Sequence, residues 1–289
     1  GRRLTALLPV HTPPGYRTVN VMPSTPSRRI ACSAAIGLAL YIGGAPVPSP
    51  AEDADATPTL AEKLFASYDA VETLTCSVRK KTEGPQQSVT LLSRITFRRP
   101  DHIHVENVAP ARRRIIADGE KLYYHVEGAP RGFSRPIREL SATWLGSLRN
   151  VPASPMENLR KLQGITEQRL PGNDAYPLRA AYDTERLTVV LSCMTSNRLS
   201  RVDFYTDKAR RQRSATYEYS QFVEAADGTC ALPCLHKAEV ILPDGTRVKE
   251  THRFTNVVIN EPVADRLFAP DLFFDDVEFV DDFEATLRP

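Results

Sequence analysis

Residues 88–100 read SVTLLSRITFRRP, and apolar side chains alternate with mostly polar ones from Val89 to Phe97. This alternation is typical of a strand with one buried face. The same period recurs on both sides of the stretch, at Leu74, Cys76 and Val78, at Ile103 and Val105, and at Leu122, Tyr124 and Val126. Asp118-Gly119 supplies a tight turn between the last two of these segments. The pattern predicts an antiparallel meander.

Two regions have a helical period instead. At 57–71, Thr57 is expected as the cap and Pro58 as the first helical residue, followed by apolar residues three and four apart at Leu60, Leu64, Tyr68 and Val71. In residues 138–164 the apolar positions are Leu140, Trp144, Leu145, Leu148, Leu159 and Leu162, with a break at Pro152 and Pro155. We therefore expect one helix before the meander and two short helices after it.

Further strands are predicted at 187–193, 199–205, 215–222, 235–242 and 247–259, separated by turn signals such as Asp227-Gly228 and Pro243-Asp244-Gly245. Eight or more strands with three helices predict a mainly β, α+β fold. Because the helices come at the start and in the middle of the strand series, we expect them to cover one face of a large sheet and to leave the other exposed.

The first 51 residues have the order of a secretory signal: Arg28-Arg29, an apolar run at 30–44, then small residues and prolines through Ala51. We expect translation to start at Met22, residues 1–21 to be an untranslated extension, and cleavage after Ala51. Residues 52–289 then form a single exported domain with an acidic C-terminal tail. The apolar run is shorter than the roughly 20 residues of a spanning helix. A retained anchor and a twin-arginine signal remain as alternatives.

The charge of the mature part argues against nucleic acid as a partner. Five of the 37 basic residues lie in residues 1–51, which leaves 32 basic residues against 35 acidic ones. A mature part with this net charge lacks the positively charged surface that binding to a nucleic-acid phosphate backbone requires. Arg112-Arg113-Arg114 is therefore interpreted as a solvated strand end.

Enzymatic motifs are also missing from the sequence, including Gly-x-Ser-x-Gly, a phosphate-binding glycine loop and His-Glu-x-x-His. We therefore expect no catalysis and no cofactor. His102, His104 and Glu106 share one strand face, but it is the face opposite Ile103. A solvated polar face is favoured there over a metal site.

Cys230 and Cys234 lie four residues apart with Leu232-Pro233 between them, and His236 follows. Zinc binding is one interpretation, but in an exported protein a local Cys230–Cys234 disulfide is favoured. Cys76 and Cys193 have inward parity, so they are either free buried thiols or a second bridge.

From about residue 60 to residue 282 the chain resembles the LolA-like periplasmic lipoprotein carriers. The resemblance is carried by Phe97-Arg98-Arg99-Pro100, by residues 115–124 (IIADGEKLYY), by Ala142-Thr143-Trp144-Leu145, and by Phe254-Thr255-Asn256-Val257 with Asn260 and Leu267-Phe268. It implies an unclosed antiparallel barrel, a curved half-barrel sheet whose concave apolar face is covered by helices. The Cys230–Cys234 loop and the acidic tail with Asp275-Asp276 and Asp281-Asp282 depart from the family.

The resemblance further implies a periplasmic carrier that binds the acyl chains of lipoproteins or other lipids and moves them toward the outer membrane. Its partners would be acylated cargo and membrane-bound donor and acceptor proteins, and we expect a monomer. The alternative is an envelope regulator that senses lipid or stress with the same fold. Strand parity and the lid position together predict a ligand-binding set of Val89, Leu91, Ile95, Phe97, Arg99, Ile103, Val105, Leu122, Tyr124, Trp144, Leu145 and Leu148.

Arg99 has a particular place in this set. Counting by twos from Val89 puts it at the rim of the apolar face, with Arg98 on the opposite face. Its guanidinium could donate to lid-helix carbonyls when the cavity is empty and to ester or amide oxygens of the cargo when it is loaded. The resemblance implies that this arginine is linked to lid opening, whereas the alternative is a solvated strand-end charge.

Overall fold

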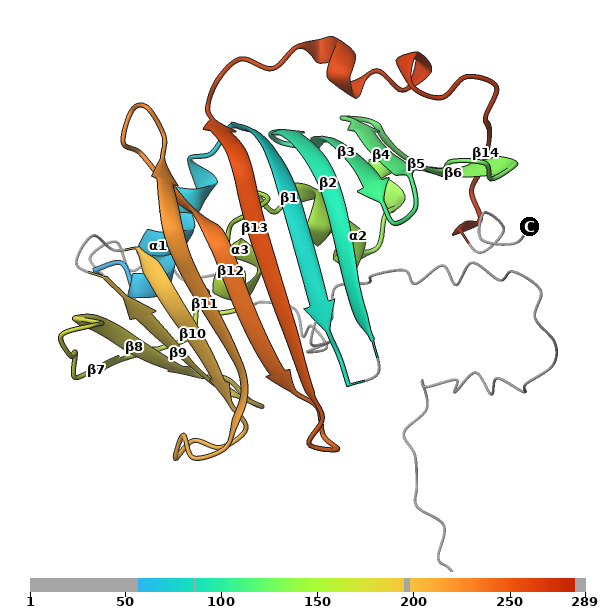
Figure 1. Cartoon of the computed structure of the whole chain (residues 1–289). Helices are drawn as coiled ribbons and strands as arrows, with labels where there is room; N and C mark the ends of the chain where they lie inside the picture. The colour runs from blue at the N-terminus through green and yellow to red at the C-terminus, as the bar shows by residue number, and fades with distance from the viewer. Residues whose placement is uncertain (1–56, 86, 195–197, 284–289) are drawn as a thin grey trace, which may run out of the picture. The chain divides into compact units, whose positions relative to one another are not determined.

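The computed structural model describes residues 57–85, 87–194 and 198–283 (Figure 1). The expected start at Met22, the signal region and the cleavage after Ala51 lie outside these described residues.

One unclosed sheet of 14 strands dominates the described chain, in the order β14-β6-β5-β4-β3-β2-β1-β13-β12-β11-β10-β9-β8-β7. Neighbouring strands are antiparallel except β14, which runs parallel to β6. The predicted half-barrel class and its meander are confirmed. The strands are β1 (Thr73–Glu83), β2 (Ser88–Arg98), β3 (His102–Ala109), β4 (Arg113–Asp118), β5 (Lys121–Val126), β6 (Arg131–Pro136), β7 (Glu167–Leu170), β8 (Leu178–Asp183), β9 (Thr188–Cys193), β10 (Leu199–Tyr205), β11 (Arg213–Glu224), β12 (Ala231–Ile241), β13 (Arg247–Ile259) and β14 (Glu278–Val280).

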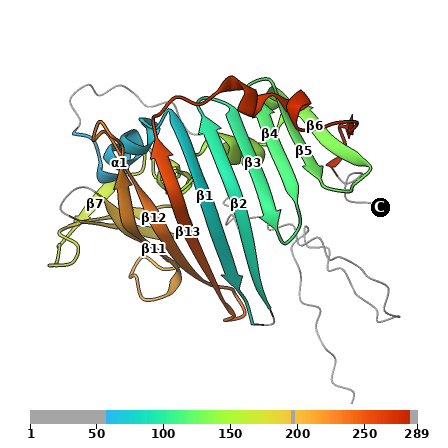
Figure 2. The same cartoon turned by 45° about the horizontal axis from the view of Figure 1, so that its top comes forward.

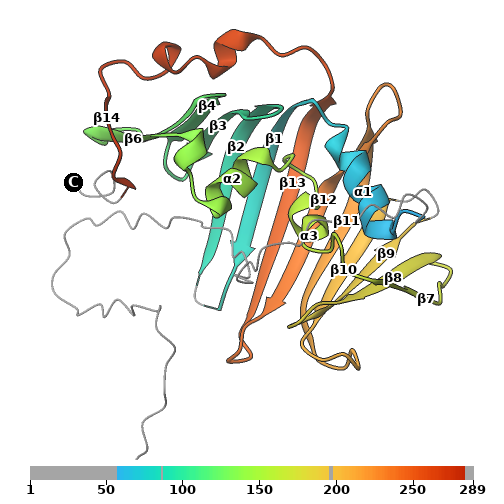
Figure 3. The same cartoon turned by 180° about the vertical axis from the view of Figure 1, so that it is seen from behind.

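The three α-helices of the described residues lie on the same side of this sheet, which we call the inner face (Figure 3). They are α1 (Leu60–Asp69), α2 (Ala142–Arg149) and α3 (Met156–Arg160), and short 3-10 turns occur at Ile137–Glu139, Asp265–Phe268 and Pro270–Leu272. None of the helices in the described part of the chain is long and apolar enough to cross a membrane.

The cap of α1 is not at Thr57, as the sequence suggested, but at Thr59. The Thr59 hydroxyl accepts from the Glu62 backbone N–H at 3.2 Å, and the Glu62 carboxylate accepts from the Thr59 N–H at 2.8 Å. This reciprocal capping box satisfies two helix-end donors at once, which a cap at Thr57 could not do, because Leu60 three residues later has no carboxylate.

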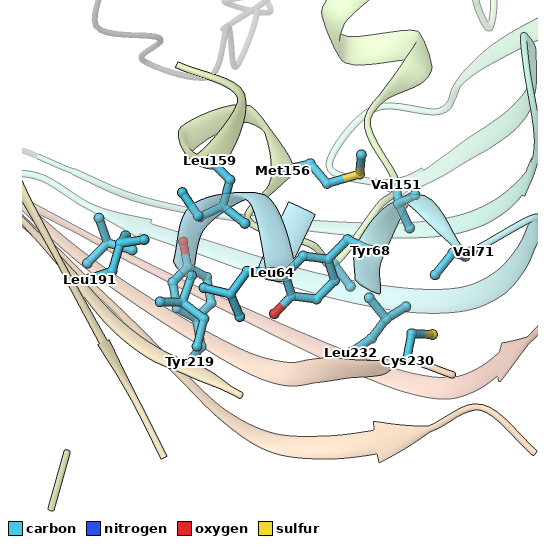
Figure 4. Packing of buried hydrophobic residues seen from close by; sticks show 14 of the residues in the cluster. Leu64, Tyr68, Val71, Val151, Met156, Leu159, Leu191, Tyr219, Cys230 and Leu232 are labelled. Atoms are coloured by element: carbon cyan, nitrogen blue, oxygen red, sulfur yellow. The ribbon is translucent and has the colours of Figure 1, made fainter. Parts of the chain in front are cut away.

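The larger apolar core, called the first cluster, lies between α1, α3 and the sheet. Leu64 and Tyr68 of α1 meet Met156 and Leu159 of α3 and Leu232 of β12 there (Figure 4). All five side chains are at most 2% exposed. Burying one such side chain contributes about 1.5–3 kcal/mol, so this cluster fixes α1 and α3 on the sheet.

Helix α1 is also held by polar groups at its N-terminus. The Tyr182 hydroxyl accepts from the Ala61 N–H at 3.0 Å and donates to Glu167 at 2.6 Å. The same Glu167 carboxylate accepts from the Leu60 N–H at 2.5 Å. A carboxylate at a helix N-terminus pairs with free N–H groups and with the positive end of the dipole, so α1 is anchored to β7 and β8.

The outer face of the sheet is largely open, as the sequence predicts, except near the ends of β3 and β4, where the C-terminal segment covers part of it. After β13, residues 261–280 run past the ends of the neighbouring strands to reach β6 (Figure 2). The ring of His102 meets Phe268 at 5.2 Å and the ring of His104 meets Phe273 at 4.6 Å between centroids. His102 and His104 are therefore covered by aromatic side chains, whereas Glu106 on the same face stays 33% exposed and pairs with Arg94 and Arg114.

Arg98 takes part in the same contact and is not a solvated strand end. Its guanidinium pairs with Asp265 and lies 4.8 Å from the centroid of the Phe268 ring. Arg114 lies similarly over Phe273, at 4.9 Å. Arginine–aromatic stacking of this kind attaches the C-terminal segment to the outer face.

The predicted Cys230–Cys234 disulfide is wrong. Cys76, Cys193, Cys230 and Cys234 are all free and buried. Cys230 directly precedes β12 and Cys234 lies within it. Four residues of extended strand span about 13 Å, whereas a disulfide needs Cα atoms roughly 4.4–6.8 Å apart.

Candidate ligand-binding site

A second, smaller apolar cluster lies on the inner face of β3–β6, below α2. Its buried members are Ile103, Ala117, Leu122, Tyr124, Phe133, Ile137, Leu140 and Leu148, and its partly buried members are Ile95, Val105, Ile115, Val126, Trp144, Leu145 and Phe283. Almost half of the side chains in the second cluster are thus only partly buried. An apolar surface of this kind on a folded chain is a candidate for binding an apolar ligand.

Eight of the twelve predicted ligand-binding residues meet in this cluster: Ile95, Ile103, Val105, Leu122, Tyr124, Trp144, Leu145 and Leu148. Phe97 lies instead in the first cluster, where it is fully buried. It therefore belongs to the permanent core beneath α1 and α3.

Val89 and Leu91 share the inner parity of β2 but belong to neither cluster. Ser93 separates them from Ile95, and its hydroxyl donates to buried Asn107 at 2.5 Å. This polar pair ends the apolar surface, and beyond it Val89 and Leu91 face Thr82 and Lys80 across the ladder.

The inner face beyond that boundary is ionic. Lys80 pairs with Glu250 at 2.9 Å, and His252 contacts the same carboxylate at 3.3 Å. Burial alone would raise the pKa of Glu250, but the hydrogen bonds and charges of His252 and Lys80 lower it to about 2. A charged pair of this kind does not suit an acyl chain, so the candidate site is confined to the second cluster.

Helix α2 covers the second cluster with few attachments. Ser141 caps it by accepting from the Trp144 N–H at 3.4 Å, and Leu148 is its one buried side chain. Trp144 lies 6.3 Å from Phe133 between ring centroids. At the other end of α2, Arg149 donates to Asp101 from Nε at 2.6 Å and from Nη2 at 3.0 Å.

Arg99 lies at the rim of the inner face, as predicted, and contacts the covering helices. Its Nε donates to the Val71 carbonyl at 2.8 Å, and its Nη2 lies 3.4 Å from the Tyr68 carbonyl and 3.0 Å from Asp69. These groups form the C-terminal end of α1, where free carbonyls and the negative end of the dipole favour a cation. Arg99 also reaches Met156 of α3, with Nη2 3.8 Å from the sulfur.

The turn between β2 and β3 therefore holds three covering segments through near-consecutive residues. Arg98 binds the C-terminal segment on the outer face, Arg99 binds the end of α1, and Asp101 binds the end of α2.

Several residues of the site were missed in the sequence. Phe133 belongs to the short strand β6, whose sequence RGFSRP has too few apolar residues to give a period. Phe283 has no neighbouring pattern at all, yet its ring lies 5.3 Å from Tyr124, 5.5 Å from Phe133 and 5.8 Å from Trp144. A polar, irregular C-terminal stretch gives no signal of such a contact.

Metal binding has no candidate site in the part of the chain that the structure describes, where three or more His, Cys, Asp or Glu side chains nowhere converge. His102 and His104 pack against phenylalanines, and the pKa of each ring is lowered, first by burial and then by a neighbouring arginine. Both effects favour the neutral, packed ring.

No protein-family model matches the sequence, and no curated protein matches it. Among solved structures, the chain is similar to a LolA superfamily protein from Nitrosomonas europaea, at 16% identity and a TM-score of 0.46 over 74% of this chain and 97% of that one. It is similar to a protein described as an outer membrane lipoprotein-sorting domain from Vibrio parahaemolyticus, at 10% identity and a TM-score of 0.47 over 74% and 96%. A complex of MucA and MucB from Pseudomonas aeruginosa matches at 9% identity and a TM-score of 0.24 over 68% and 93%.

Proposed function

We propose that the chain is an exported, non-catalytic carrier that binds the acyl chains of lipoproteins or other lipids in the second cluster and moves them toward the outer membrane. The observation that carries the proposal is the contrast between the two clusters. Most members of the first cluster are fully buried beneath α1 and α3, whereas almost half of the second cluster is only partly buried, including Trp144 and Leu145 of α2.

The free energy of exposing an acyl chain to water explains why a carrier needs a partly open apolar cluster. An acyl chain of about 15 methylenes costs on the order of 12 kcal/mol to leave in water, at about 0.8 kcal/mol per methylene. An apolar surface that opens and closes would accept the chain and would hide itself when empty. Helix α2 is suited to this movement because Leu148 is its one fully buried side chain, and its other attachments are the partly buried Trp144 and Leu145 and the Arg149–Asp101 ion pair.

The leader in the sequence supports the periplasm as the place of action, and the near-neutral mature part supports lipid rather than nucleic acid as cargo. The proposal includes membrane-bound donor and acceptor proteins, between which a monomeric carrier would travel.

Native mass spectrometry of the mature protein, purified without detergent, tests the proposal. We expect co-purified acyl species that are released when the protein is denatured. A second assay measures transfer of an acylated probe from donor to acceptor vesicles. An acyl-free protein that neither binds nor transfers the probe would refute the proposal. Binding without transfer would favour the envelope regulator instead.

A further inference from the structure

The end of the described chain folds back into the candidate site. Strand β14 adds to the edge of the sheet in parallel to β6, with Glu278, Phe279 and Val280 opposite Arg131, Gly132 and Phe133. The lack of a side chain at Gly132 leaves room for the Phe279 ring, because an added Cβ would lie 2.5 Å from it. Residues 281–283 then continue from this edge, and Phe283 packs in the second cluster.

The polar contact beside Phe283 is equally specific. Arg135 of β6 donates from Nε to the Asp281 carboxylate at 2.5 Å and from Nη2 to the Asp281 carbonyl at 2.8 Å. Its guanidinium lies 5.5 Å from the centroid of the Phe133 ring, and Phe133 in turn meets Phe283 at 5.5 Å. The chain thus places an apolar group inside the cluster and an anion on the arginine at its margin.

Arg135 belongs to the site by its position in the sheet. It pairs with Leu122 across the ladder, and it lies two residues after Phe133, so all three side chains share the inner face. Leu122 and Phe133 are buried members of the second cluster. Arg135 is therefore a cation at the edge of an apolar surface, and it presents a fork of donors that suits a carboxylate or a phosphate.

We infer that Arg135 is the anchor for the anionic group of an amphiphilic ligand, and that residues 278–283 are an internal competitor that imitates this ligand. The inference rests on the proposed function and specifies its ligand as an acyl chain next to an anionic group. On loading, the acyl chain takes the place of Phe283 and the anion takes the place of Asp281. A fatty-acid carboxylate and a phospholipid phosphate share this chemistry.

The test compares three fluorescent probes with the same acyl chain on the full mature chain: a free fatty acid, its neutral methyl ester and a lysophosphatidic acid. In an Asp281→Ala background, where the internal carboxylate no longer occupies Arg135, Arg135→Gln should weaken binding of an anionic probe about tenfold, the effect of losing one charge-assisted contact, and should leave the ester unchanged. Asp281→Ala should strengthen binding of the anionic probe alone, because Arg135 becomes available. Phe283→Ala should strengthen binding of all three probes.

The ester serves as the check on folding, and Arg138→Gln is the matched control, because Arg138 is exposed and pairs with neighbouring Glu139. The anionic probe that loses more affinity in Arg135→Gln identifies the carboxylate or the phosphate as the preferred group. Equal losses for the ester and the anionic probes, or no change for either, would overturn the role of Arg135. Failure of the parent to bind any probe would instead refute the carrier function.

Discussion

Asp101 and Arg149 form a bidentate ion pair that joins the β2–β3 turn to the end of α2. Asp101 is mostly buried, with 14% of its side chain exposed, whereas Arg149 is 48% exposed. The pair is the main polar attachment of the helix that covers the second cluster, so it should set how readily α2 opens.

Arg149→Gln should therefore change ligand exchange more than stability. A partly exposed ion pair contributes about 1 kcal/mol or less, so the free energy of unfolding should fall by no more than that. Dissociation of an acyl probe, measured by stopped-flow fluorescence, should become about two- to fivefold faster. The reason is that the ion pair no longer stabilises the position of α2 over the second cluster. Adding Asp101→Asn should have little further effect. If the effects of the two substitutions on the dissociation rate were additive, the Asp101–Arg149 pair would not be what keeps α2 closed over the second cluster.

Arg99→Leu should have a larger structural effect. It removes the contacts to the Val71 carbonyl and Asp69 and leaves the end of α1 without its cation, at a cost of about 1.5–3 kcal/mol. Chemical denaturation measures this loss. Arg98→Leu is the matched control on the opposite face, and it should instead expose residues 261–280 to limited proteolysis. Equal behaviour of the two variants in both assays would contradict the assignment of the arginines to opposite faces.

The two arginines also show what parity can and cannot predict. The alternation in residues 88–97 correctly places Arg98 and Arg99 on opposite faces, because side chains of an extended strand must alternate. It cannot predict how far along a strand the cover extends. Val89 and Leu91 therefore entered the predicted site, although the Ser93–Asn107 pair ends the apolar surface before them.

The contacts of the C-terminal segment are the largest part of the structure that the sequence did not predict. Its phenylalanines occur at positions 268, 273, 274, 279 and 283, with neither the helical nor the strand period. Each contact depends on a ring in a distant strand, such as His104 for Phe273. Periodicity reports only local structure, so neither the partial cover of the outer face nor the contribution of Phe283 to the site was predictable.

Acid should destabilise the protein through His236. Burial, and then the charge of neighbouring His252, lower the pKa of His236 to about 3. The centroid of the His236 ring lies 6.0 Å from that of the stacked His252 ring and 4.9 Å from that of Phe254. Because the folded state holds the ring neutral while the unfolded chain protonates near pH 6.5, stability is full above that pH and is lost as pH falls toward 3.

Between pH 7 and pH 5 this group should lower the free energy of unfolding by at most about 2 kcal/mol. Denaturation curves of the parent and of His236→Gln measure the difference, and the variant should have the shallower pH dependence. Identical slopes would show that His236 is not held neutral. The interval from pH 7 to pH 5 excludes the contribution of Glu250. Because the pKa of Glu250 is lowered, its protonation destabilises the protein only at more acidic pH.

The cysteines should be reduced even in the exported protein. Burial raises the pKa of the Cys76 and Cys193 thiols to about 12, so little reactive thiolate is present. We expect four thiols to react with a labelling reagent after unfolding without reductant, and far slower labelling of the folded protein. Fewer than four labels on the unfolded, unreduced protein, counted by mass spectrometry, would demonstrate a disulfide.

The most direct test of the acyl site uses Trp144, which is the single tryptophan of the sequence and lies on α2 in the second cluster. Fatty acids brominated along the acyl chain quench a tryptophan only on close approach. Titration of the mature protein should give saturable quenching of Trp144, and an unbrominated fatty acid of the same length should reverse it by competition. Saturable binding by calorimetry without quenching of Trp144 would show that the acyl chain does not enter the second cluster.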